Sequence, residues 1–210
     1  MNIHTRMSLE FREARAEYSM DLSALAKDIL NHGDRAWAER VFESAARKAR
    51  SSDDKGWILI DGLGYGLCSD ALAEQLFAYL EKRVRPFERL AALDVFIQVD
   101  DTNRASHYAM RWAARARSIE FLTEVAQKAL NHVLVPKEQI HMWIERAESL
   151  AQSDDDWYLV AKAWAHSGQG EDAVRAADIY DGIRDDLDDL MTTIELLRDV
   201  APEAAADRCA

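Results

Sequence analysis

Three lysines of this chain each stand four residues before a second hydrogen-bonding side chain. The pairs are Lys27 with Asn31, Lys128 with His132, and Lys162 with His166. Residues four apart lie on the same face of a helix. An ammonium group with a hydrogen-bond donor one turn away can bind a carboxylate. Each pair therefore predicts a contact with an acidic segment or a chain terminus of a partner protein.

The four-residue spacing recurs at further polar and aromatic side chains. It links Ser23 to Lys27, Asp61 to Tyr65, Asp94 to Gln98, Glu124 to Lys128, and Tyr158 to Lys162. An ordinary solvent-exposed helix face has the same pattern, which is the alternative interpretation. The candidate partner-binding residues are Lys27, Asn31, Tyr65, Asp94, Gln98, Lys128, His132, Tyr158, Lys162 and His166.

The histidines and aspartates do not have the spacing of a metal site. His132 and His166 would lie on successive packed helices about 10 Å apart, which is too far to share an ion. Residues 154–156 and 185–189 are acidic but lack the alternating ligands of a calcium loop. Both runs are better explained as helix starts, so we expect no bound metal and no cofactor.

Catalysis also lacks a recognisable set of residues. Ser167-Gly168 is a turn without a preceding strand, so it is not a nucleophile elbow. The glycines at 62, 64 and 66 lack the Gly-Lys-Ser/Thr sequence of a phosphate-binding loop. We expect a protein that is not an enzyme.

Composition narrows the class of protein. The 210 residues include only three prolines and eight glycines and carry a formal net charge of −12. This favours helices, and it argues against binding to nucleic acid or a membrane surface, because both need Lys and Arg to meet anionic groups. Residues 82–117 hold 8 basic and 4 acidic side chains, whereas residues 137–210 hold 7 and 18. That distribution would also let two copies associate head to tail.

Cysteine usage and hydropathy indicate a cytoplasmic protein. Cys68 and Cys209 are far apart and form no disulfide framework, which fits a reducing compartment. The first residues are charged and contain no apolar core of a signal peptide. No apolar run is long enough to span a bilayer.

The stretch Ser153–Ile179 predicts two helices joined by a short turn. Trp157, Val160, Ala161 and Trp164 fall on one helical stripe. Ser153 and the aspartates after it cap the first helix, and Ser167-Gly168-Gln169-Gly170 ends it. We take this hairpin as the unit from which the chain is built.

The junction between turn and helix recurs along the chain with a nearly constant period. Successive junctions are 35, 34, 35 and 33 residues apart, at Ala36, Ala71, Ala105, Ile140 and Ala173. A fixed period near 34 indicates stacked helical hairpins. The predicted organisation is one helical-repeat domain over residues 1–210, with repeats at 20–50, 55–85, 87–117, 119–152 and 155–181 and a terminal helix at 185–200.

Residues 155–181 resemble a tetratricopeptide repeat. The matching positions are Trp157, Val160, Ala161, Trp164, Gly168 and Ala173. The chain departs from the family pattern at Ala177, where a large aromatic side chain is usual, and it lacks a closing proline. The resemblance extends over residues 20–181, mainly through the period. HEAT-type stacking is the alternative arrangement.

The resemblance implies an all-α fold, a right-handed α-solenoid of about five antiparallel hairpins with an extra C-terminal helix. It also implies a scaffold or adaptor that binds a peptide or partner helix in a concave groove lined by the first helix of each hairpin. The alternative is an enzyme or ligand sensor with a pocket near Gly62–Gly66. RNA binding by hairpins of this period is a third reading, which the acidity opposes.

Residues 1–7 should be frayed before a helix capped by Ser8, and the chain should fray again after Pro202. Pro86 should open a helix. The glycine-rich helix at 55–66 should be the weakest or the one with the closest neighbour. The six tryptophans should pack between helices, since most lie on apolar stripes.

Overall fold

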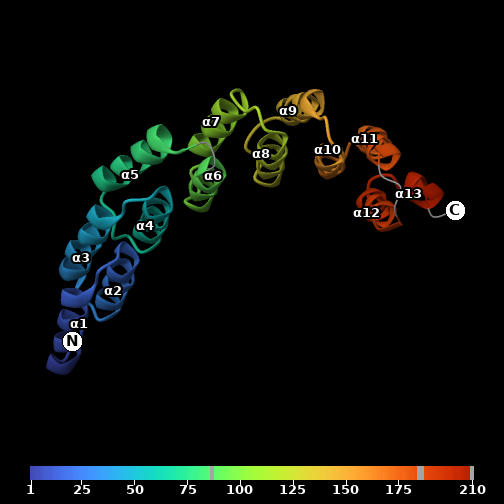
Figure 1. Ribbon diagram of the computed structural model, residues 1–210. Coiled ribbons are helices and arrows are strands. Elements are labelled where there is room, and N and C mark those ends of the chain that lie inside the picture. Colours follow the sequence, from blue (N-terminus) through green and yellow to red (C-terminus); the bar gives the residue numbers. More distant parts are fainter. Residues whose placement is uncertain (86–87, 184–186, 209–210) are drawn as a thin grey trace. The chain divides into compact units, whose positions relative to one another are not determined.

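A computed structural model describes residues 1–85, 88–183 and 187–208 of the chain. Within these ranges it contains thirteen helices and no strand (Figure 1). The prediction of an all-α protein is therefore confirmed. None of the helices in the described ranges is long and apolar enough to cross a bilayer.

The chain divides into two compact units, which we call the N-terminal unit, Met1–Asp101, and the C-terminal unit, Thr102–Ala210. The N-terminal unit contains α1 (Ile3–Arg15), α2 (Ser19–Asn31), α3 (Arg35–Lys48), α4 (Ser52–Gly64), α5 (Asp70–Arg83) and α6 (Arg89–Gln98). The C-terminal unit contains α7 (Thr102–Ala113), α8 (Ile119–Asn131), α9 (Lys137–Leu150), α10 (Asp154–Ser167), α11 (Gly170–Ile183), α12 (Leu187–Leu197) and α13 (Pro202–Arg208). The predicted repeat at 87–117 lies across this division, and the repeat register stays a prediction.

In the N-terminal unit, α2 packs on α3 and α4 packs on α5. Helix α4 also contacts both α2 and α6, so that α2, α4 and α6 form a row, coloured blue to green in Figure 1. The side chains of Phe42, Ile58, Leu59 and Phe96 are completely buried in this unit. The row places the exposed faces of α2, α4 and α6 next to one another.

Two glycines allow α4 to approach its neighbours closely. A Cβ atom at Gly56 would lie 2.6 Å from Val95 Cγ2 of α6, and one at Gly62 would lie 2.7 Å from the Phe42 ring of α3. Neither distance is compatible with a real side chain. The expectation of a close neighbour for this glycine-rich helix is confirmed.

The C-terminal unit contains a second row. Helix α10 contacts α8 and α12, while α8 packs on α9 and α10 packs on α11. Arg146 of α9 donates to the carbonyl oxygens of Ala113, Ala114 and Ala116 at 2.9, 3.1 and 2.5 Å. A cation at the C-terminal end of α7 complements the helix dipole and satisfies carbonyls that have no partner within the helix.

The predicted cap of α10 is present. The Asp156 N–H donates to Ser153 Oγ at 3.2 Å, and Asp156 Oδ2 accepts from the N–H groups of Ser153 and Gln152 at 2.9 and 3.1 Å. These bonds, that of Ser153 first, lower the pKa of the Asp156 carboxyl. Gly168 ends the helix with a φ of 80°. The acidic run 154–156 is thus a helix start, and α4 has the same arrangement at Ser51 and Asp54.

The two ends of the chain differ from expectation. Helix α1 begins at Ile3, because Asn2 Oδ1 accepts from the Thr5 N–H at 2.8 Å and caps it; the expectation of a frayed start was wrong. Pro202 opens the short helix α13, where fraying was expected. Proline at the first position of a helix loses no hydrogen bond, which explains this start. Pro86 lies outside the described residues.

The tryptophans are mostly buried, with one clear departure. Trp37, Trp112, Trp143 and Trp164 are each at most 5 % exposed, in line with a packing role. Trp57 of α4 is 52 % exposed. This indole is therefore a surface group, and the expectation that it packs between helices was wrong.

Candidate functional site

The structure brings together the polar residues of α2 and α4. Ser23 Oγ donates to Asp61 Oδ2 at 2.7 Å, and Lys27 Nζ donates to the same oxygen at 3.0 Å. The Lys27 ammonium also lies 5.4 Å from the centroid of the Tyr65 ring. Four residues that share the four-residue spacing therefore form one cluster between two neighbouring helices.

This cluster changes what Lys27 can bind. Its side chain is 27 % exposed and that of Asp61 is 14 % exposed, so the ion pair is partly withdrawn from water. Because Asp61 already balances the ammonium charge, a carboxylate from a partner would gain less from binding Lys27. On this part of the surface, Asn31 and Tyr65 remain exposed instead.

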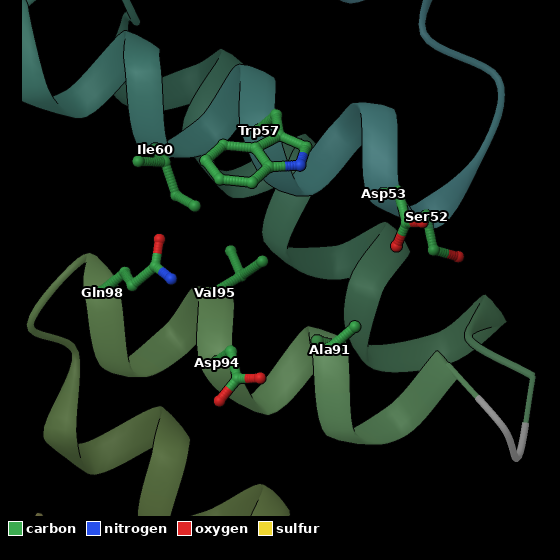
Figure 2. A pocket seen from close by; sticks show the side chains of 9 residues that line it. Ser52, Asp53, Trp57, Ile60, Ala91, Asp94, Val95 and Gln98 are labelled. Atoms are coloured by element: carbon green, nitrogen blue, oxygen red, sulfur yellow. The ribbon is translucent and has the colours of Figure 1, made fainter.

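A depression of about 170 Å³ lies between α4 and α6. Figure 2 shows Trp57 and Ile60 projecting from α4 over Val95 of α6, with Asp53 at one end and Gln98 at the other. The remaining lining residues are Ser52, Ala91, Ala92 and Asp94. Two of the predicted candidates, Asp94 and Gln98, thus border a real cavity.

The end of the depression near the start of α4 is held by polar contacts. Ser52 Oγ donates to Glu88 Oε2 at 3.2 Å, and the same oxygen accepts from the Arg85 N–H at 2.9 Å. Asp53 follows Ser52 and is exposed in the first turn of α4. Acidic side chains are favourable there because the helix start is electropositive.

Trp57, which borders the depression, was not predicted from the sequence to lie on the surface. It stands four residues before Asp61 and eight before Tyr65, on the same face of α4. That spacing was available in the sequence. The general tendency of tryptophan to be buried obscured it.

The candidates of the C-terminal unit are arranged differently. Tyr158 packs against Tyr180 of α11, with the ring centroids 5.7 Å apart. Lys162 lies beside His166, and the pKa of His166 is lowered, first by burial and then by the Lys162 charge. This imidazole is therefore a neutral hydrogen-bonding group near pH 7. On α8, Lys128 is half-buried and His132 is exposed at the helix end.

A wider, open depression of about 800 Å³ lies between α11 and α13. Gly170, Val174, Val200 and Pro202 contribute to it, and none of them is among the candidate partner-binding residues. Three acidic side chains also border it, those of Glu171, Glu203 and Asp207.

The alternative prediction of an enzyme or ligand sensor placed a pocket at the glycine series at the end of α4, and it stays a prediction. Phe42 and Cys68 occupy the space around Gly62, while Gly64 and Gly66 are exposed. Burial, and secondarily Asp70, raise the pKa of the Cys68 thiol to about 11. The thiol therefore lacks the thiolate character of a reactive cysteine.

Among the described residues, no three His, Cys, Asp or Glu side chains are placed to hold a metal ion. No family model matches the chain, and no curated protein matches its sequence.

Proposed function

We propose that this protein is an interaction scaffold of the cytoplasm, built as a right-handed, tetratricopeptide-like α-solenoid of about five antiparallel hairpins. Two observations support the architecture. The sequence repeats with a period of 33–35 residues, and each unit contains a row of helices, α2–α4–α6 and α8–α10–α12. Helices α2, α4, α6, α8 and α10 each lie at the start of one predicted hairpin, and α12 lies within the predicted terminal helix.

The proposed binding face is the exposed side of α2, α4 and α6. The observation that carries this assignment is Trp57, which leaves half of its surface exposed beside a depression on that face. Aromatic side chains dominate the energetics of protein interfaces because they bury a large area with few rotatable bonds. Tyr65, 47 % exposed, extends the aromatic surface toward α2.

The size of the depression favours a polypeptide ligand. Its volume of about 170 Å³ is smaller than the roughly 300–1,000 Å³ of sites that enclose a drug-sized molecule. It is suited to a single side chain of an extended peptide or partner helix. The rest of the ligand would lie along the row of helices, and no chemical step is assigned to the face.

Selection from a phage-displayed library of random peptides tests this function. We expect enriched peptides whose binding weakens at least about tenfold when Trp57→Ala replaces the wild type. The matched control is Met142→Ala, which removes another large exposed side chain, 59 % exposed on α9. Peptides that bind wild type, Trp57→Ala and Met142→Ala equally would contradict the proposed face, and the absence of any enriched peptide would contradict the proposed function.

A further inference from the structure

We propose that the depression between α4 and α6 binds one basic side chain, Lys or Arg, of the peptide. This inference rests on the proposed function and adds the chemical class that the face selects. It departs from the sequence expectation of an acidic ligand. The reason lies in the groups that surround the depression.

Trp57 supplies the first of these groups. Its exposed indole borders the depression from α4, opposite Val95 and Gln98 of α6 (Figure 2). The face of an indole carries negative electrostatic potential and attracts ammonium and guanidinium groups within about 6 Å of the ring centre. Tryptophan is the strongest of the aromatic side chains in this respect.

Acidic side chains supply the second group. Asp53 and Asp94 both line the depression, and Glu88 lies next to it through its bond to Ser52. Asp53 shows no hydrogen bond or ion pair to another side chain in the part of the chain that the structure describes. A cation placed over Trp57 would therefore meet the Asp53 carboxylate, whereas a ligand carboxylate would be repelled by it.

The apolar lining explains why the ligand is a long basic side chain. Ile60, Val95 and Ala91 border the space between Trp57 and the polar ends. Lys and Arg carry three or four methylene groups that pack on such surfaces while the charged head reaches polar partners. Lys27 of α2, a cation of the candidate set, is paired with Asp61 instead.

Two small probes test the pocket directly. In an NMR titration, Nα-acetyl-arginine amide should shift the Trp57 indole N–H and the Asp53 and Gln98 amide signals. Nα-acetyl-citrulline amide, which has nearly the same shape but no charge, should bind at least about fivefold more weakly. Equal shifts from both probes, or no shift at Trp57 from either, would overturn the inference.

The variant Asp53→Asn tests the carboxylate, and the chain provides a matched control. Asp155 is the second residue of α10 and stands between Ser153 and Asp156 of its capping box, as Asp53 stands between Ser51 and Asp54 in α4. Asp155→Asn therefore removes the same charge from an equivalent helix start. We expect weaker binding of the arginine probe by Asp53→Asn and unchanged binding by Asp155→Asn. Equal weakening by both variants would show that probe binding depends only on the net charge of the protein, and it would contradict the proposed site.

Selected peptides separate this inference from the function on which it rests. Their enriched sequences should contain a Lys or Arg whose replacement by citrulline or norleucine lowers affinity for wild type but not for Trp57→Ala. Peptides that bind the face without such a residue would overturn the inference and leave the scaffold function standing. Binding of the arginine probe at Trp57 without any selected peptide would support the pocket chemistry and contradict the scaffold.

Discussion

The two rows of helices differ in chemistry at equivalent positions. Counted from their capping serines, Ser51 and Ser118, α4 and α8 carry residues of the four-residue spacing at the same three distances. Helix α4 has Trp57, Asp61 and Tyr65 there, and α8 has Glu124, Lys128 and His132. At these positions α4 therefore carries two aromatic side chains and one carboxylate, whereas α8 carries a carboxylate, an ammonium group and an imidazole.

Helices α2 and α10 make a second equivalent pair. Ser23 and Lys27 of α2 correspond to Tyr158 and Lys162 of α10, counted from the residues that precede each helix. The small Ser23 is buried and reaches Asp61 of the neighbouring helix, whereas Tyr158 packs on Tyr180. A shared spacing determines which residues lie on one face. The neighbouring helix determines whether that face is paired within the chain or remains exposed.

The largest expected effect on stability concerns the close packing of the N-terminal row. Gly56→Ala places a methyl group against Val95 and should lower the free energy of unfolding by about 1–3 kcal/mol. Gly64→Ala is the matched control, because Gly64 has open space around it, and should raise the stability by up to about 1 kcal/mol. Urea denaturation measures both. Equal midpoints for the two variants would mean that α4 does not depend on this approach to α6.

A smaller effect is expected for the pair between α2 and α4. A double-mutant cycle with Lys27→Met and Asp61→Asn should give a coupling energy of about 1 kcal/mol, since both side chains are mostly buried. The control cycle uses Glu43→Gln and Arg47→Met, whose side chains are 58 % and 67 % exposed and whose coupling should be about 0.3 kcal/mol. Equal coupling energies in the two cycles would mean that the partly buried pair is no stronger than the exposed one.

The smallest expected effect lies in the C-terminal row. Lys162→Met should raise the pKa of His166 toward 6.5, because one of the two causes that lower it, the Lys162 charge, is removed while burial remains. An NMR titration of the imidazole measures the change, with Lys27→Met as the control that should leave this pKa unchanged. A pKa that does not rise would show that burial alone lowers it.

The lowered pKa of His166 also predicts how the stability of the fold changes with pH. The unfolded chain takes up this proton more readily than the folded chain, so the stability contribution of neutral His166 is lost as pH falls below about 6.5. Lys162→Met should make that loss smaller.

Much of the fold follows from local sequence signals. Ser51, Ser118 and Ser153 mark helix starts, and the four-residue spacing places Ser23, Lys27, Asp61 and Tyr65 on two helix faces. Caps and spacing depend on neighbours along the chain, which explains why they can be read from it. The helix starts at Asn2 and Pro202 are local signals too, but they are weak ones in short terminal segments.

The candidate site was harder to predict because it depends on contacts between helices. The bond between Lys27 and Asp61 joins residues 34 positions apart. Trp57 is 52 % exposed although it stands next to Gly56, where α4 closely approaches Val95 of α6. Residue types alone favour the opposite outcome for both residues, a free lysine and a buried tryptophan.

The exposure of Trp57 also provides a spectroscopic reporter of the face. Four of the other five tryptophans are buried, and Trp157 is half-buried, so a water-borne collisional quencher should reach the indole of Trp57 first. The carboxylates around it should favour quenching by caesium over quenching by iodide. A ligand that covers the depression should shield this indole and shift its emission to shorter wavelength, so occupancy of the face can be followed by fluorescence in the unlabelled protein.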